Sequence, residues 1–140
     1  MTPRYPWLFF LLFFSFFFAS AQEVISYRWN NRVLMVLSKN PGSAEVNRQM
    51  ALFADQEEEL NERKLIILQI FPNYYLKGSD NFVRREDNQM YFDYKTSETP
   101  FEVILLGLDG GLKFQRNDVV LPAELYALID AMPMRRSERN

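Results

Sequence analysis

The chain has 140 residues, no cysteine and no histidine, and a formal net charge of −2 at pH 7. The absence of cysteine excludes thiol nucleophiles, disulfides and thiolate metal sites, and the absence of histidine excludes Ser-His-Asp triads and the usual zinc sites. The slightly acidic balance also lacks the excess of basic residues that favours nucleic-acid binding. We therefore expect no cofactor, no metal and no nucleic-acid partner.

The N-terminal stretch, residues 1–21, has the pattern of a signal peptide. Arg4 is followed by an apolar run from Trp7 to Phe18 and by the small residues Ala19-Ser20-Ala21. A retained membrane anchor is the alternative, but it needs roughly 18 or more apolar residues. We expect cleavage after Ala21, membrane contact only during export, and a periplasmic or extracellular domain over residues 22–140.

The domain begins with two apolar runs, residues 33–37 and 65–71, that flank a helical pattern. Both runs are too short for helices and are typical of strands buried on both faces. Ser43 is a suitable N-cap for a helix whose apolar positions 46, 50, 53 and 60 share one face. This order predicts two parallel strands joined by a crossover helix.

The segment 73–99 has a weaker pattern. Residues 78–81 indicate a loop. A short helix over residues 84–94 competes with an extended conformation for its last five residues, because the apolar positions there fit both periods. The structure of this segment stays open at this point.

A hairpin and a helix are predicted for the C-terminal third. The apolar run 101–108 leads into the turn residues Asp109-Gly110-Gly111 and an alternating strand at 112–116. Pro122 then opens a helix that we expect to stop at Pro133. Leu121 precedes this helix and has no polar atom with which to cap it, so Asn117 or Asp118 would have to substitute.

Together these elements predict an α/β domain. The order strand, helix, strand, uncertain segment, strand, strand, helix is that of the thioredoxin fold. In that fold four strands form a mixed sheet in the order 4-3-1-2, flanked by helices. The predicted first and third strands are the most apolar, as expected at the centre of a sheet.

Three segments of the chain resemble the DUF4174 family. They are Tyr27-Arg28-Trp29-Asn30-Asn31-Arg32, Gly107-Leu108-Asp109-Gly110-Gly111-Leu112-Lys113 and Ile129-Asp130-Ala131-Met132-Pro133-Met134-Arg135-Arg136. Leu108 and Leu121 depart from the lysine and the capping aspartate that the family often has there. The resemblance spans the mature chain and implies an exported thioredoxin-like or peroxiredoxin-like domain, of a kind found in bacteria and in larger animal extracellular-matrix proteins. It implies no particular reaction.

Candidate binding residues are few, and each has a structural alternative. Pro100 lies where thioredoxin-like folds carry a cis-proline beside a peptide groove, and whether it is cis here stays open. It either marks a retained peptide groove or is a structural leftover of that fold. Trp29 and Arg32 could form a binding patch, or Trp29 could cap the core. Arg135 and Arg136 could bind an anionic partner, or could simply suit a helix C-terminus.

No catalytic or metal-binding set can be assigned. Ser43 lies where a redox protein of this fold needs a thiolate, and a hydroxyl without a neighbouring base cannot act as one. Asp80, Asp87 and Asp109 match no calcium loop. We therefore expect a non-enzymatic domain that binds an envelope or extracellular protein or other macromolecule. The alternative is a redox accessory, or an enzyme based on carboxylates or tyrosine, and the oligomeric state stays open.

Overall fold

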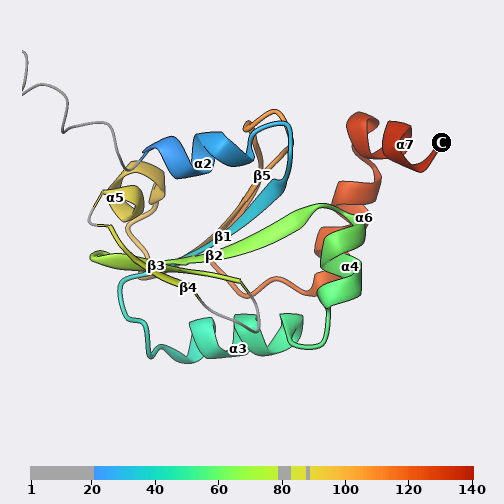
Figure 1. The fold of residues 1–140 in the computed structure, drawn as a ribbon. Coiled ribbons are helices and arrows are strands. Elements are labelled where there is room, and N and C mark those ends of the chain that lie inside the picture. Colours follow the sequence, from blue (N-terminus) through green and yellow to red (C-terminus); the bar gives the residue numbers. More distant parts are fainter. Residues whose placement is uncertain (1–20, 79–82, 88) are drawn as a thin grey trace, which may run out of the picture.

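A six-stranded mixed sheet is the centre of the computed structural model, which describes residues 21–78, 83–87 and 89–140 (Figure 1). The strands are β1 Arg32–Ser38, β2 Leu65–Ile70, β3 Tyr74–Lys77, β4 Val83–Glu86, β5 Phe101–Leu106 and β6 Leu112–Arg116. Their order across the sheet is β4-β3-β2-β1-β5-β6. β1 and β2 are parallel, and every other neighbouring pair is antiparallel. The chain is therefore an α/β protein, as the sequence predicts.

The prediction of a four-stranded sheet is wrong. β6, β5, β1 and β2 do lie in the predicted order, but β3 and β4 extend the sheet beyond β2. Arg85 pairs with Tyr75, and the Arg84 guanidinium lies 3.8 Å from the ring centre of Tyr74. These contacts hold residues 84–86 in a strand that covers the edge of β3, where the sequence allowed a helix.

Of residues 84–94, for which the sequence allows a helix, only the last five are helical. They form α5, Met90–Tyr94, and Asp87 starts this helix by accepting hydrogen bonds from the backbone N–H groups of Gln89 and Met90. The predicted loop at 78–81 falls almost entirely outside the described residues, and Asp80 lies there too.

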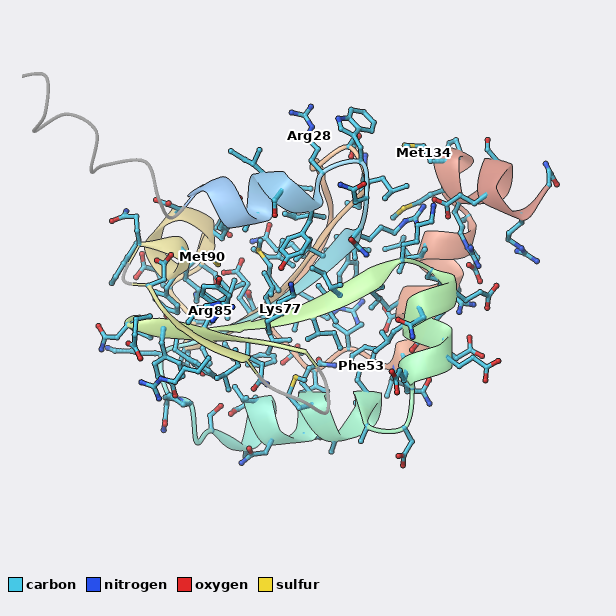
Figure 2. All side chains as sticks on the ribbon, in the orientation of Figure 1. Arg28, Phe53, Lys77, Arg85, Met90 and Met134 are labelled. Carbon is cyan, nitrogen blue, oxygen red and sulfur yellow. The ribbon has the colours of Figure 1, made fainter. Side chains whose placement is uncertain are left out.

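Helices cover both faces of the sheet (Figure 1). α2, Ala21–Tyr27, and α5 lie on one face, whereas α3, Ala44–Phe53, α4, Glu57–Glu62, and α6, Pro122–Asp130, lie on the other. The side chains of β1 alternate accordingly: Val33 and Met35 join the core under α2, and Leu34 and Val36 join the core under α3. Figure 2 shows Met90 and Phe53 on these opposite faces.

The helix boundaries follow from local chemistry. The Val46 N–H donates to Ser43 Oγ at 3.3 Å, which confirms Ser43 as the N-cap of α3. The single crossover helix predicted there is wrong, because Asp55 adopts a positive φ of 62° and separates α3 from α4. Leu121 is the N-cap residue of α6 and makes no side-chain capping hydrogen bond.

The C-terminus holds a further helix that the sequence did not predict. α6 ends at Asp130, and Pro133 begins α7, Pro133–Arg139, instead of ending a helix. A proline suits this position because the first turn of a helix leaves its backbone N–H unpaired. The basic residues of this segment therefore lie within a helix.

Among the described helices, none is long and apolar enough to cross a membrane. The predicted signal peptide, residues 1–21, lies outside the described residues except for Ala21, the first residue of α2.

A buried carboxylate fixes the segment between α5 and β5. Glu102 of β5 is fully buried and accepts hydrogen bonds from the backbone and hydroxyl of Thr96, the backbone and hydroxyl of Ser97, and the amide of Gln115. The ammonium group of Lys95 lies 3.4 Å from the same carboxylate. A carboxylate with this many donors anchors the segment to the sheet.

These donors determine the charge state of Glu102. Burial alone disfavours the ionised form, but the hydrogen bonds from Thr96, Ser97 and Gln115 outweigh it and lower the pKa of the carboxyl group from 4.5 to about 2. Because the folded-state pKa lies below the ordinary value, Glu102 stabilises the fold above pH 4.5 and loses that effect as the pH falls toward 2.

We predict that the free energy of unfolding decreases by about 3 kcal/mol between about pH 7 and pH 2 because of Glu102 alone. Urea denaturation of the wild type and of Glu102→Gln across this range measures the effect. The variant should be less stable near neutral pH and should lack this part of the acid dependence.

The matched control is Glu98→Gln, since Glu98 is an exposed carboxylate in the same segment. It should change stability by less than about 0.5 kcal/mol. Equal acid dependence in wild type and Glu102→Gln would show that Glu102 is not the group responsible.

Candidate functional site

Arg32 is a fully buried cation whose hydrogen bonds are incomplete. Its Nη1 donates to the carbonyl oxygen of Arg63 at 2.8 Å and to the carboxylate of Glu138 at 3.2 Å. Its Nε and Nη2 are buried and have no hydrogen-bond partner among the described residues. A buried donor left unpaired costs about 1–3 kcal/mol, and more when it is charged, so this arrangement needs an explanation.

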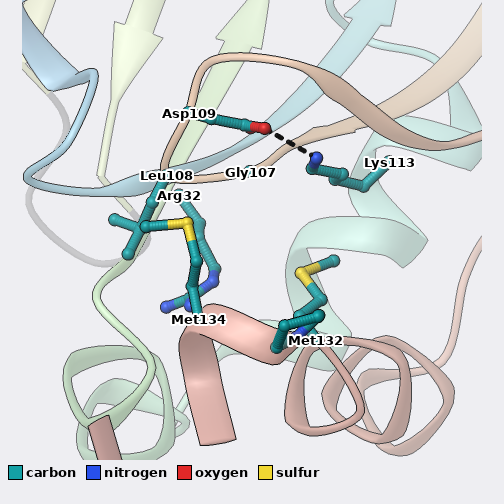
Figure 3. A pocket seen from close by; sticks show the side chains of 8 residues that line it. Arg32, Gly107, Leu108, Asp109, Lys113, Met132 and Met134 are labelled. Carbon is teal, nitrogen blue, oxygen red and sulfur yellow. Dashed lines mark hydrogen bonds and ion pairs between the residues drawn. The ribbon is translucent and has the colours of Figure 1, made fainter. Parts of the chain in front are cut away.

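A pocket of about 270 Å³ lies beside this guanidinium (Figure 3). One wall is the β5–β6 hairpin, and the other wall is the junction between α6 and α7. The hairpin contributes Gly107, Leu108, Asp109 and Lys113, and the junction contributes Met132, Pro133 and Met134. Figure 3 shows Arg32 next to Met134, with Leu108 beside them. The pocket therefore joins a buried cation to apolar side chains.

The hairpin wall contains an ion pair between Lys113 and Asp109, and the Lys113 side chain packs against Gly107. Lys113 Nζ lies 2.9 Å from Asp109 Oδ2, and the Gly111 N–H donates to Asp109 Oδ1 at 3.0 Å. A Cβ atom on Gly107 would lie 2.5 Å from Cε of Lys113, so a side chain there would displace the lysine. Gly110 completes the turn with a positive φ of 78°, which glycine adopts without strain.

Among the described residues that line the pocket, Asp109 is the one carboxylate. The hydrogen bond from Lys113, helped by the Gly111 N–H, lowers the pKa of Asp109. A general acid or base works best with a pKa near the working pH, so this shift moves Asp109 away from such a role at neutral pH. In the described ranges no three acidic side chains are grouped so that they could hold a metal ion.

The helix wall is held by ion pairs around Arg135. This side chain is buried, and it contacts Asp130 at 3.2 Å, Glu62 at 2.6 Å and Glu138 at 3.6 Å. Arg63 contacts the other oxygen of Asp130 at 2.8 Å. Burial opposes ionisation of Asp130, but the hydrogen bonds from these two arginines lower its pKa. The ion pairs join α7 to α4 and α6.

Two of the predicted binding residues lie elsewhere. Pro100 is exposed and outside the pocket, and every peptide bond of the described residues is trans, so the Thr99–Pro100 bond, which the sequence left open, is trans. Its carbonyl oxygen accepts a hydrogen bond from the Lys39 N–H at 3.0 Å, which continues the pairing of β5 with β1.

Trp29 does not cap the core, because 60% of its surface is exposed. Its backbone N–H donates to the Leu108 carbonyl oxygen, and its φ of 69° lies in the left-handed region. This backbone geometry fixes Trp29 at the hairpin with its ring in solvent, beside the guanidinium of Arg28 at 5.4 Å. Trp29 is not among the residues that line the pocket.

Arg135 does not form part of an anion-binding surface, contrary to one interpretation of the sequence. All three guanidinium nitrogens of Arg135 already donate to Asp130 and Glu62, so this side chain is not available to an anionic partner. Arg136 is exposed on the same helix and does not line the pocket. Of the five predicted residues, Arg32 alone lines the pocket.

The sequence pattern indicates a hairpin turn at Asp109-Gly110-Gly111 and a helix end at Met132-Pro133-Met134. It does not identify either wall as part of a binding site. A signal was present, because the three segments that resemble the family are those that supply Arg32, the hairpin wall and the helix wall. Only the sheet order and α7 bring these segments together.

We predict that Arg135→Ala lowers the free energy of unfolding by about 2–3 kcal/mol, because a buried set of charged hydrogen bonds is lost. Amide hydrogen exchange in α7 should also become faster. Arg136→Ala, an exposed arginine on the same helix, is the control and should change stability by less than about 0.5 kcal/mol. Similar losses in both variants would contradict the assigned role of Arg135.

Comparison with protein-family models supports the resemblance noted in the sequence. The model of DUF4174, a domain of unknown function, matches residues 24–138. The matched range contains all three similar segments and both walls of the pocket. A search of curated proteins finds no significant match. The chain belongs to the DUF4174 family.

Proposed function

We propose that this chain is an exported, non-enzymatic binding domain whose ligand site is the pocket beside Arg32. The observation that carries the proposal is the pair of unpartnered nitrogens, Nε and Nη2, on a buried guanidinium that lines a pocket. Binding sites commonly combine apolar walls with a few polar groups that orient the ligand, and Leu108, Met132 and Met134 provide such walls here.

The proposed fold is thioredoxin-like. The support is the run β6-β5-β1-β2 within the sheet, with its parallel pair β1 and β2 and its antiparallel pairs β1 with β5 and β5 with β6. β3 and β4 are then an addition at the edge beyond β2. With no cysteine in the chain, such a domain keeps the scaffold without its thiol chemistry.

The lining of the pocket favours binding over catalysis. Enzymes that use carboxylates as both acid and base place two of them, with different pKa values, in the site, and a tyrosine-based enzyme needs a tyrosine there. Among the described residues that line the pocket, Asp109 is the single carboxylate and there is no tyrosine. We infer that the natural ligand is part of, or released from, an envelope or extracellular macromolecule.

We predict that small-molecule fragments bind in this pocket and that methionine methyl groups report their position. Met132 and Met134 line the pocket, whereas Met35 and Met90 lie in the core on the other face of the sheet. In carbon-13 NMR of the mature chain, a mixed library of neutral, cationic and anionic fragments should shift the Met132 and Met134 signals and leave those of Met35 and Met90 unchanged.

A library without any member that shifts the Met132 and Met134 signals would contradict the proposed site. Binding that shifts only signals elsewhere, such as Lys39 and Pro100 at the opposite end of β1 and β5, would also contradict it. Arg84→Ala, an exposed substitution on β4, is the control and should leave every fragment affinity unchanged.

Export has its own test. When the full chain is produced in a bacterial host, the mass of the purified protein should correspond to a mature form that begins at Gln22, because Ala19 and Ala21 provide the small residues of the cleavage site. Ala21→Arg should block cleavage and retain the full mass. A wild-type protein that keeps residues 1–21 and stays inside the cell would contradict export.

A further inference from the structure

We propose that the pocket binds a carboxylate group that carries a short apolar substituent. This inference rests on the proposed function and names the class of ligand.

The unused donors form one edge of the guanidinium. Nη1 is occupied by the carbonyl oxygen of Arg63 and by Glu138, so Nε and Nη2 remain. The N–H groups on this edge are parallel and match the spacing of two carboxylate oxygens. An amide or an alcohol offers a single oxygen with no charge and would satisfy this edge less well.

The charge of the pocket favours a carboxylate over a phosphate group. Lys113 also lines the pocket, but its side chain is partly exposed and its charge is paired with Asp109 at 2.9 Å. Among the described lining residues, Arg32 is therefore the one cation whose unpaired donors are buried. A phosphate monoester carries a charge close to −2 and three acceptor oxygens, which one guanidinium edge cannot satisfy. One carboxylate matches one available edge.

The walls select an apolar substituent of limited size. Leu108, Met132 and Met134 surround the space next to Arg32. The volume of about 270 Å³ lies just below the range of ~300–1,000 Å³ that is common for drug-sized ligands. Such a space suits a group about as large as one amino-acid side chain, so the ligand is either a free branched acid or the C-terminal residue of a peptide.

Met134 is the side chain that moves on binding. Nε and Nη2 are covered in the structure, and Met134 lies beside Arg32 in Figure 3 with 41% of its surface exposed. A methionine side chain has three rotatable bonds and adapts readily to a new neighbour. Rotation of Met134 toward solvent would uncover the guanidinium edge and let the carboxylate replace a thioether that cannot accept strong hydrogen bonds.

NMR titration of the mature chain tests the proposal with two matched pairs of probes. The first pair is 4-methylpentanoate and its amide, and the second is acetyl-alanyl-leucine and its C-terminal amide. Each acid should bind about tenfold or more tightly than its amide, because the charged two-oxygen contact is lost in the amide. The acids should also shift the Arg32 Nε–H signal and the Met134 methyl signal.

The outcomes separate this inference from the proposed function. Equal binding of acids and amides with shifted Met132 and Met134 signals would overturn the carboxylate and leave the pocket as a binding site. Tighter binding of inorganic phosphate than of both acids would overturn it too. Absence of any binding to the pocket would overturn both proposals. Tighter binding of the peptide acid than of 4-methylpentanoate supports the carboxylate and identifies a chain terminus as its source, and the reverse order identifies a free acid.

Arg32→Lys provides a second test, because lysine keeps the charge and removes the two-donor edge. It should weaken binding of both acids by about tenfold or more, whereas Arg136→Lys, on the exposed face of α7, should not. If Arg32→Lys does not fold, the acid and amide pairs and the Nε–H signal of the wild type still decide the question.

Discussion

Arg32 Nη1 donates to the carbonyl oxygen of Arg63 and to the carboxylate of Glu138, and these two hydrogen bonds hold the candidate site together. Arg63 closes α4 just before β2, and Glu138 belongs to α7, so one buried cation connects the start of β1 with two helical segments. Glu138 is also close to Lys64 and Arg135. Its Oε2 atom lies near Arg32 and Arg135, whereas its Oε1 atom, 3.6 Å from Lys64, is buried without a hydrogen-bond partner among the described residues. Nε and Nη2 of Arg32 likewise have no partner there.

The antiparallel neighbours β1 and β5 each carry one buried charge, Arg32 and Glu102. The hydrogen bonds of Glu102 are satisfied, whereas those of Arg32 are incomplete. Glu102 pairs with Leu37 near one end of β1, and Arg32 lies at the other end. Glu102 is surrounded by donors, and its pKa falls to about 2 as a result. Of the five N–H groups of the Arg32 guanidinium, the three on Nε and Nη2 have no partner among the described residues. A satisfied buried charge holds a loop in place, whereas an unsatisfied one at a pocket is suited to a ligand.

Much of the fold could be predicted from the sequence, because strands buried on both faces leave a clear pattern. The apolar runs became β1, β2 and β5, and Ser43 caps α3 as expected. β3 and β4 could not be predicted, since their stability comes from pairing with β2 and with each other and their own residues are mixed in polarity.

The site was less accessible to sequence reasoning than the fold. Arg32 could be selected as a candidate, but its burial and its unpaired nitrogens depend on α7. This helix was not predicted, because Pro133 suggests a helix end and in fact begins α7. Arg135 and Arg136 look equivalent in the sequence, and the structure separates them, since Arg135 is buried among carboxylates and Arg136 faces solvent. Neighbouring residues with the same chemistry can be distinguished only when the helix that carries them is placed.

A crystal structure of residues 22–140 grown with 4-methylpentanoate tests the proposed role of Arg32 most directly. We expect the two carboxylate oxygens opposite Nε and Nη2 of Arg32, the branched chain against Leu108 and Met132, and the Met134 side chain rotated toward solvent. A structure in which Nε and Nη2 are already paired with protein acceptors, and the acid binds elsewhere or not at all, would contradict it.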